Sequence, residues 1–175
     1  MENPMIESHD VSMEMANRIF FRLYQCANML HKTGSRAVES QGLTTQQWAV
    51  LGALSRLGVA GGMGVGELAR YLMVSRQNLS GLVGRMERDG HVELAPDPQD
   101  RRSRLVRMTD SGRRVWQEEA QVRIRHYYGQ ALANFSEADM AHLLHYLLKL
   151  LGNMQTIDSA SGAAESEGER AAPAA

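Results

Sequence analysis

The chain has 175 residues, of which 43% are hydrophobic and 22% charged, and its formal net charge is −1. This length predicts one domain, or one domain with a dimerisation arm, and the near-neutral charge excludes a uniformly basic nucleic-acid coat protein. The single cysteine excludes an intrachain disulfide and a cysteine-based metal cluster. Because the sequence has neither a signal peptide nor an apolar run of about 18 residues, we expect a cytoplasmic protein without a membrane span.

The N-terminal part of the chain predicts a flexible start followed by one long helix. Residues 1–10 are polar, whereas from 11 to about 40 apolar side chains recur every three or four positions, as in an amphipathic helix. Thr44 and Gln47 have the spacing of a capping box, which predicts the start of the next helix. The glycine-rich stretch 58–66 lacks the spacing of a nucleotide-binding loop, so we interpret it as a connector with at most a very short strand.

Residues 65–89 predict a helix-turn-helix. Apolar residues recur at helical spacing on both sides of a break at Met73–Val74. Ser75 can cap the second helix and Gly90 can end it. Residues 91–108 alternate between apolar and polar around a turn-forming tip, which is typical of a β-hairpin and predicts a wing.

The second helix and the hairpin tip carry side chains suited to reading DNA. Gln and Asn pair with adenine and Arg with guanine in the major groove, and an arginine on a hairpin can enter the minor groove. Between Arg70 and Arg114 there are ten arginines and six acidic residues, a local charge of +4. Gly81 and Gly84 would allow close approach to a groove or to another helix. The alternative interpretation is a solvated polar face. The residues expected to contact DNA are Ser75, Arg76, Gln77, Asn78, Ser80, Arg85, Asp100, Arg101, Arg102 and Arg104.

The C-terminal part predicts two further helices and a tail. Thr109 can cap the first of these helices and Ser136 the second. The second has a wide apolar stripe, more than one small domain can cover, so segments 11–40 and 110–155 are expected to form a dimerisation region. The alternative is that this stripe folds back on its own core. Residues 158–175 are rich in Ala, Ser, Gly and Glu and are expected to be a disordered tail.

These elements predict a mostly α-helical protein with a small β-hairpin wing. The winged helix-turn-helix lobe covers residues 43–109, and the N- and C-terminal helices form an all-helical dimerisation region. Several motifs of the lobe, among them Ser75–Leu79, Met86–Val92 and Asp97–Ser103, resemble the MarR family of transcriptional regulators. The resemblance extends over roughly residues 10–155.

The resemblance implies a homodimer with a winged helix-turn-helix and, commonly, repression that a small phenolic or related ligand relieves. It also implies that Arg102 is the minor-groove residue, with Asp100 as its partner. A twofold pair would place two reading helices about 34 Å apart on a palindromic operator in double-stranded DNA.

The family's effector pocket lies where the dimerisation helices meet the DNA-binding lobe. Aromatic side chains suit a planar ligand, and arginine suits a carboxylate or phosphate. The segment around Trp48 and the run Tyr71–Asn78 resemble regulators of aromatic-acid breakdown, some of which sense CoA thioesters. This resemblance implies an aromatic acid or its CoA thioester as effector, and we expect no cofactor. For Trp48 and Phe20 plain core packing is the alternative. The candidate lining residues are Phe20, Tyr24, Asn28, Arg36, Trp48, Arg56 and Met73.

We therefore expect a homodimeric, sequence-specific DNA-binding regulator, a repressor relieved by its effector. The alternatives are a redox-responsive regulator acting through Cys26 and a ligand-independent architectural DNA-binding protein. We expect no metal, since His142 and His145 are interpreted as a solvated or interface pair. The sequence has no catalytic motif of the hydrolase or metalloprotease kinds, so we do not expect an enzyme.

Overall fold

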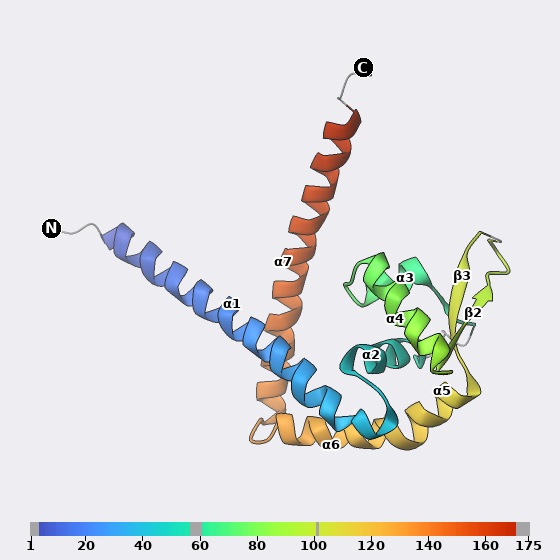
Figure 1. Ribbon diagram of the computed structural model, residues 1–175. Coiled ribbons are helices and arrows are strands. Elements are labelled where there is room, and N and C mark those ends of the chain that lie inside the picture. The colour runs from blue at the N-terminus through green and yellow to red at the C-terminus, as the bar shows by residue number, and fades with distance from the viewer. Residues whose placement is uncertain (1–3, 57–60, 101, 171–175) are drawn as a thin grey trace. The chain divides into compact units, whose positions relative to one another are not determined.

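The computed structural model describes residues 4–56, 61–100 and 102–170. It is mostly helical with one small antiparallel sheet, which confirms the predicted fold class (Figure 1). The helices are α1 (Pro4–Ala37), η1 (Glu39–Gln41), α2 (Thr45–Leu54), α3 (Val65–Tyr71), α4 (Arg76–Arg88), α5 (Asp110–Arg114), η2 (Val115–Ala120), α6 (Gln121–Ala131) and α7 (Glu137–Arg170). The strands are β1 (Met63–Gly64), β2 (Val92–Pro96) and β3 (Arg104–Met108). None of the helices, over the described ranges, is both long and apolar enough to cross a membrane.

The chain divides into two compact units, residues 1–130 and residues 131–175. The first contains the lobe formed by α2, α3, α4 and the sheet, and α4 and the hairpin of β2 and β3 lie beside each other (Figure 1). Its core is built from fully buried aliphatic side chains of every one of these elements, including Leu51, Leu68, Leu79 and Val106 at 0% exposure. This burial holds α4 and the hairpin of β2 and β3 in one packed unit.

The sheet has the order β1-β3-β2, and both pairings are antiparallel. In the hairpin, Val92 lies opposite Met108 and Leu94 opposite Val106, so that alternate residues of both strands face the core. The strand β1 is only two residues long and pairs Met63 with Val106. It is the very short strand that was expected within residues 58–66, of which residues 58–60 lie outside the described part of the chain.

Helix ends in the lobe follow the signals in the sequence. The Thr44 hydroxyl accepts from the backbone N–H of Gln47, and the Gln47 side chain accepts from the backbone of Thr44, so the predicted capping box is confirmed. Ser75 caps α4 by accepting from the backbone N–H of Asn78 at 3.2 Å. Gly90 follows α4 with φ of 76°, the left-handed conformation that glycine adopts without strain.

The base of the wing is joined to α5 by a very close backbone contact. Thr109 caps α5, and its hydroxyl also donates to the carbonyl of Gly90 at 2.6 Å. Gly112, on α5, is buried against His91, and a Cβ at this position would overlap the carbonyl oxygen of His91. Only glycine fits here, because the neighbouring atoms are backbone atoms that cannot rotate away.

The helix after the wing is continuous but not uniform, which the sequence did not predict. Residues 115–120 form a π-helical turn, η2, between α5 and α6. This wide turn buries Trp116, whose ring lies 3.3 Å from the position of a Cβ on Gly52 of α2. The helix that Thr109 caps ends with α6 at Ala131.

At both chain ends the structure has helix in segments for which the sequence predicted a flexible start and a disordered tail, and residues 1–3 and 171–175 of these segments lie outside the described part of the chain. Residues 1–10 were expected to be flexible, yet α1 begins at Pro4, a residue type that favours the first turn of a helix. Residues 158–175 were expected to be disordered, yet α7 continues to Arg170. The alanines and glutamates of this segment are good helix formers, and no proline interrupts them before Pro173.

Both long helices expose apolar side chains. On α1, Ile19 is 51% and Phe21 61% exposed, and on α7, Leu144 is 58% and Leu148 59% exposed. Ser136 caps α7 as predicted, because its hydroxyl accepts from the backbone N–H of Asp139 at 3.1 Å. The Asp139 carboxylate in turn accepts from the backbone N–H of Ser136 at 2.9 Å.

Candidate nucleic-acid interface and effector pocket

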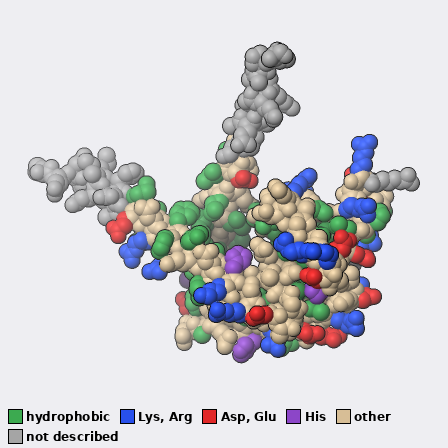
Figure 2. Space-filling view, viewed as in Figure 1, with side chains coloured by type: hydrophobic (Ala, Val, Ile, Leu, Met, Phe, Trp, Pro, Cys, Tyr) green, Lys and Arg blue, Asp and Glu red, His purple; other side chains and the backbone are tan. Residues whose placement is uncertain are grey.

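Helix α4 has one buried and one exposed face, as the sequence predicted. Its apolar residues are buried, whereas Ser75, Arg76, Gln77, Asn78, Ser80 and Arg85 are all exposed. At 100° per residue, Gln77, Gly81, Gly84 and Arg88 lie opposite the buried face. In the space-filling view, basic side chains gather over this helix and the wing (Figure 2). The arrangement presents hydrogen-bond donors on the outside of a rigidly held helix.

Not every polar side chain of α4 reaches outward. The Ser80 hydroxyl donates to the carbonyl of Arg76 at 2.8 Å, so its proton is engaged within the helix. The guanidinium of Arg76 lies against Gly66 of α3, with its Nη2 2.7 Å from the position of a Cβ there. Arg76 is therefore placed on the flank of α4 next to α3, away from Arg85.

The tip of the wing is stiffened by side-chain to backbone hydrogen bonds. The Asp97 carboxylate accepts from the backbone N–H of Gln99 at 2.8 Å, and the Asp100 carboxylate accepts from that of Arg102 at 2.9 Å. Asp100 is thus joined to Arg102, but through the backbone N–H. Arg102 and Arg104 are exposed, whereas Arg101 lies outside the described residues. These two hydrogen bonds hold the backbone of the hairpin tip in place, and the Arg102 side chain remains exposed.

A pocket of about 990 Å³ opens on the other flank of α4. Helix α1 reaches it through Leu30 and His31, α2 through Trp48, and α6 through Tyr128. The described lining residues are Leu30, His31, Thr45, Gln46, Trp48, Ala49, Leu72, Val74, Gln77, Asn78, Leu79, Gly81, Leu82, Arg85 and Tyr128. Helix α4, whose exposed face is the candidate DNA-contacting surface, therefore forms one wall of this pocket.

The aromatic wall of this pocket is held from two sides. Trp48 meets Tyr127 and Tyr128 edge to face, at ring-centroid distances of 6.0 and 5.8 Å. The hydroxyls of Thr33 and Tyr127 are 3.0 Å apart, which joins α1 to α6. Burial raises the pKa of the Tyr128 phenol above its ordinary value, more than its contact with Trp48 lowers it, so this phenol is neutral at pH 7 and can donate a hydrogen bond.

The predicted ligand residues are not brought together within this chain. Trp48 lines the pocket of about 990 Å³, while Phe20, Tyr24 and Asn28 are exposed on α1. Met73 lies in the turn between α3 and α4, with φ of 54°, and is 56% exposed.

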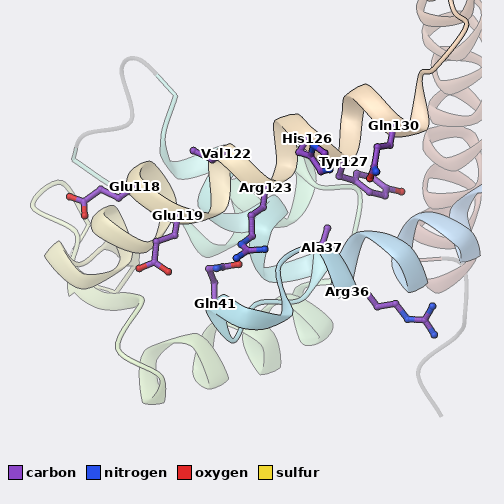
Figure 3. A pocket seen from close by; sticks show the side chains of 10 residues that line it. All are labelled: Arg36, Ala37, Gln41, Glu118, Glu119, Val122, Arg123, His126, Tyr127 and Gln130. Carbon is purple, nitrogen blue, oxygen red and sulfur yellow. The ribbon is translucent and has the colours of Figure 1, made fainter.

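The two arginines proposed as anion partners have other neighbours. The guanidinium of Arg56 donates to the hydroxyl of Tyr71 and lies 5.1 Å from the centre of its ring. Arg36 lines a second pocket, of about 650 Å³, between the end of α1 and the helix formed by η2 and α6 (Figure 3). There Gln41 and Arg123 point toward one another, and Glu118 and Glu119 add carboxylates. Sequence reasoning missed Leu30, His31 and Tyr128 as pocket residues and placed Arg85 only at the DNA.

Two further candidates from the sequence are a redox-active cysteine and a metal site. Cys26 is exposed on α1. Within the described part of the chain, no three His, Cys, Asp or Glu side chains lie together as a metal site would need.

Comparisons with known proteins agree with this geometry. The model of the MarR family matches residues 41–103. The chain is 72% identical over 149 residues to the transcriptional activatory protein BadR of Rhodopseudomonas palustris, covering 85% of each chain. It is 32% identical over 123 residues to the homoprotocatechuate degradative operon repressor of Escherichia coli, covering 69% of this chain and 80% of the relative.

A solved structure shares the fold: CouR from Rhodococcus jostii RHA1 bound to p-coumaroyl-CoA, with a TM-score of 0.67 and 24% identity, over 77% of this chain and 92% of that one. The relatives are regulators of transcription and not enzymes. With an exposed reading helix, a basic wing and these relatives, the chain is a DNA-binding transcription regulator that belongs to the MarR family.

Proposed function

We propose that the protein is a homodimer that binds a palindromic operator and controls genes for the breakdown of aromatic acids. The observation that carries the DNA-binding part is the exposed hydrogen-bonding face of α4 beside a basic wing tip stiffened by Asp97 and Asp100. Gln77 and Asn78 are suited to adenine in the major groove, and Arg102 to the minor groove.

The homodimer is supported by the apolar faces of the long helices. Large hydrophobic side chains on α1 and α7 are about half exposed, among them Phe20 at 51%, Tyr146 at 63% and Ile157 at 66%. Monomeric proteins rarely expose apolar patches of this extent. A second copy would cover these faces by the interlocking of helices that is typical of symmetric dimers.

The effector class is supported by the pocket beside α4. Its aromatic wall of Trp48 and Tyr128 suits a planar ring. One relative is named for a homoprotocatechuate degradative operon, and CouR was solved with an aromatic CoA thioester. We propose an aromatic acid or its CoA thioester as the effector, and repression relieved by that effector as the mode of action.

A second candidate is activation of transcription. It is favoured by one observation, that the relative with 72% identity is named an activatory protein, whereas the relative with 32% identity is named a repressor. A promoter fusion with and without the protein separates the two: loss of the protein raises expression under a repressor and lowers it under an activator.

DNA binding is tested by titrating the protein against an operator fragment and against random DNA of the same length at moderate salt. We expect a preference of about 10³ or more, as specific binders show. A preference below about 10 would leave an architectural DNA-binding protein as the function. In the same assay, Arg102→Ala is expected to weaken operator binding by about 10-fold or more, because it removes the minor-groove contact. Unchanged affinity would remove the wing from the interface.

A further inference from the structure

We propose that the pocket between the end of α1 and the helix formed by η2 and α6 binds an α-amino acid through its ammonium and carboxylate groups. The inference goes beyond the proposed function, because this pocket shares no lining residue with the pocket beside α4. The lining residues come from α1, η1, η2 and α6 (Figure 3). The volume of about 650 Å³ lies within the range of small-molecule sites.

Gln41 contributes a buried acceptor that the chain itself does not satisfy. The side-chain oxygen Oε1 of Gln41 is buried and accepts no hydrogen bond from any described residue. Such oxygens are rare in folded proteins, because burial of an acceptor costs free energy unless a donor reaches it. Since the Gln41 side chain lines the pocket, a ligand with an N–H donor can satisfy this oxygen.

The facing wall supplies an unpaired guanidinium. Arg123 of α6 points toward Gln41, yet no hydrogen bond joins the two side chains (Figure 3). Glu119 lies four residues before Arg123, a spacing at which helical side chains are neighbours and can form an ion pair. Over the described part of the chain, however, the one ion pair is that of Arg113 with Asp110. Arg123 and Glu119 therefore both keep their charges available to a ligand.

The lining of the pocket carries both signs of charge in equal number. Arg36 and Arg123 contribute two guanidinium groups, and Glu118 and Glu119 contribute two carboxylates. A simple anion in this pocket meets two repelling acids, and a simple cation meets two repelling arginines. A zwitterion is attracted by both sets of groups. The pocket therefore favours a ligand with one positive and one negative group over an ion of either sign.

An α-amino acid carries these two groups next to one another. Because Arg123 and Gln41 face one another, the acceptor for one and the donor for the other must lie close together on the ligand. The carboxylate can accept two parallel hydrogen bonds from the Arg123 guanidinium. The ammonium can donate to Oε1 of Gln41 and to the carboxylate of Glu119. The side chain of the ligand is then left with Val122 and Tyr127, which also line the pocket.

Both walls are held in place by contacts within the chain. The backbone N–H of Gln41 donates to the carbonyl of Val38 at 3.1 Å, and Val38 is completely buried. On the other wall, Ile124 anchors α6 in the core, and the hydroxyl of Tyr127 lies 3.0 Å from that of Thr33. The ligand therefore meets groups on preformed walls, which lowers the entropy cost of binding.

The test uses the full-length protein and the standard α-amino acids, added one at a time in a thermal-shift screen. We expect at least one of them to raise the melting temperature. Calorimetry then compares that amino acid with two analogues, one without the carboxylate and one without the ammonium. Each analogue should bind about 10-fold or more weakly, the value of a lost charge-assisted hydrogen bond.

Two results of these measurements overturn the proposal. One is that no standard amino acid binds. The other is that either analogue binds as tightly as the amino acid, since the pocket would then be a site for a simple ion.

Two arginine variants locate the bound amino acid. Arg123→Gln should weaken its binding about 10-fold or more, because the carboxylate loses its charged partner. Arg125→Gln is the matched control, since Arg125 is exposed on the same helix but does not line the pocket, and it should bind as the wild type does. Both substituted side chains are exposed, so both variants are expected to fold. Unchanged affinity of Arg123→Gln overturns the proposal.

Gln41→Met separates binding from folding. Methionine has nearly the same length and leaves no buried amide oxygen without a partner, so this variant should be at least as stable as the wild type. It should nevertheless bind the amino acid about 10-fold more weakly. Unchanged affinity, or a loss of stability that shows the oxygen to be satisfied within the chain, overturns the proposal. Operator binding through α4 and the wing is measured separately, so these results are distinct from failure of the proposed function.

Discussion

The DNA-binding lobe and the long helices differ in how far their apolar side chains are exposed to solvent. In the lobe, Leu51, Leu68 and Leu79 are completely buried, whereas Phe21 on α1 and Leu148 on α7 are 61% and 59% exposed. The lobe satisfies its hydrophobic surface within one chain, and the long helices do not. The difference indicates that the lobe is stabilised by its own packing, and it supports the proposal that a second subunit covers the apolar faces of the long helices. Mutations in the lobe should therefore lower the free energy of unfolding, whereas mutations on the long helices should disrupt assembly of the subunits.

The largest expected effect is on the fold of the lobe. Gly112→Ala places a Cβ against the carbonyl oxygen of His91, where neither backbone can move without separating α5 from the wing. We expect the free energy of unfolding to fall by about 3 kcal/mol, the upper range for overpacking. Chemical denaturation measures it. Gly152→Ala on α7, where a Cβ meets nothing within 4 Å, is the control. Equal stability of Gly112→Ala and the wild type would contradict the close contact.

The next largest effect is expected on the assembly of the subunits, with the fold of the lobe unchanged. Leu144→Glu combined with Leu148→Glu puts two charges on the exposed apolar face of α7. We expect a monomer with a folded lobe, and operator affinity reduced by about 100-fold or more, since two linked reading heads gain 10²–10⁴ over one.

Sedimentation measures the mass, and circular dichroism checks the fold. Lys149→Glu, on the opposite side of the same helix, changes the charge without touching the apolar stripe and should remain dimeric. A dimeric double variant would show that this face does not hold the subunits together.

A smaller effect should raise stability while it lowers function. Gly84 lies on the outward side of α4, and a Cβ there meets nothing within 4 Å, so no packing inside the chain requires glycine. Gly84→Ala should stabilise the fold by about 0.8–1 kcal/mol, the helix-propensity difference, yet weaken operator binding by crowding the groove. Gly129→Ala on α6, equally free of neighbours, should raise the melting temperature and leave DNA binding unchanged. Identical behaviour of the two variants would argue against close approach at Gly84.

The smallest effect concerns the start of α7. Hydrogen bonds from the side chain and the backbone of Ser136 lower the pKa of Asp139 below its ordinary value of 3.8. A carboxyl group with a depressed pKa stabilises the folded state above that ordinary value, and the contribution is lost as the pH falls through the lowered pKa. The first turn of α7 should therefore fray in acid in the wild type, and already at neutral pH in Asp139→Asn. Amide exchange at residues 137–140 measures both effects.

Local signals in the sequence predicted the lobe well. Thr44 with Gln47, Ser75 and Gly90 each act on hydrogen bonds within a few residues, and the structure uses all of them as predicted. Their effect depends on nearby backbone alone, so no knowledge of the tertiary fold was needed.

The pocket was harder to predict because it depends on distant contacts. The sequence shows that Arg85 lies on the polar side of α4, but not which flank of α4 faces α1. That choice is made by the packing of α1 on α2, where a Cβ on the buried Gly34 would come within 2.6 Å of Thr45. Arg56 was likewise unpredictable as a partner of Tyr71, 15 residues away. The π-helical turn at residues 115–120 leaves no periodic signal strong enough to find it.

That wide turn also has an evolutionary consequence. A helix with one inserted residue rotates everything after it by about 100° relative to an uninterrupted α-helix. The two tyrosines that meet Trp48, Tyr127 and Tyr128, follow this insertion by about two turns. A descendant that lost a single residue there would turn Tyr128 away from the pocket beside α4 and Tyr127 away from the pocket that Arg36 lines. A change of chain length at residues 115–120 can therefore alter the walls of both pockets from a distance.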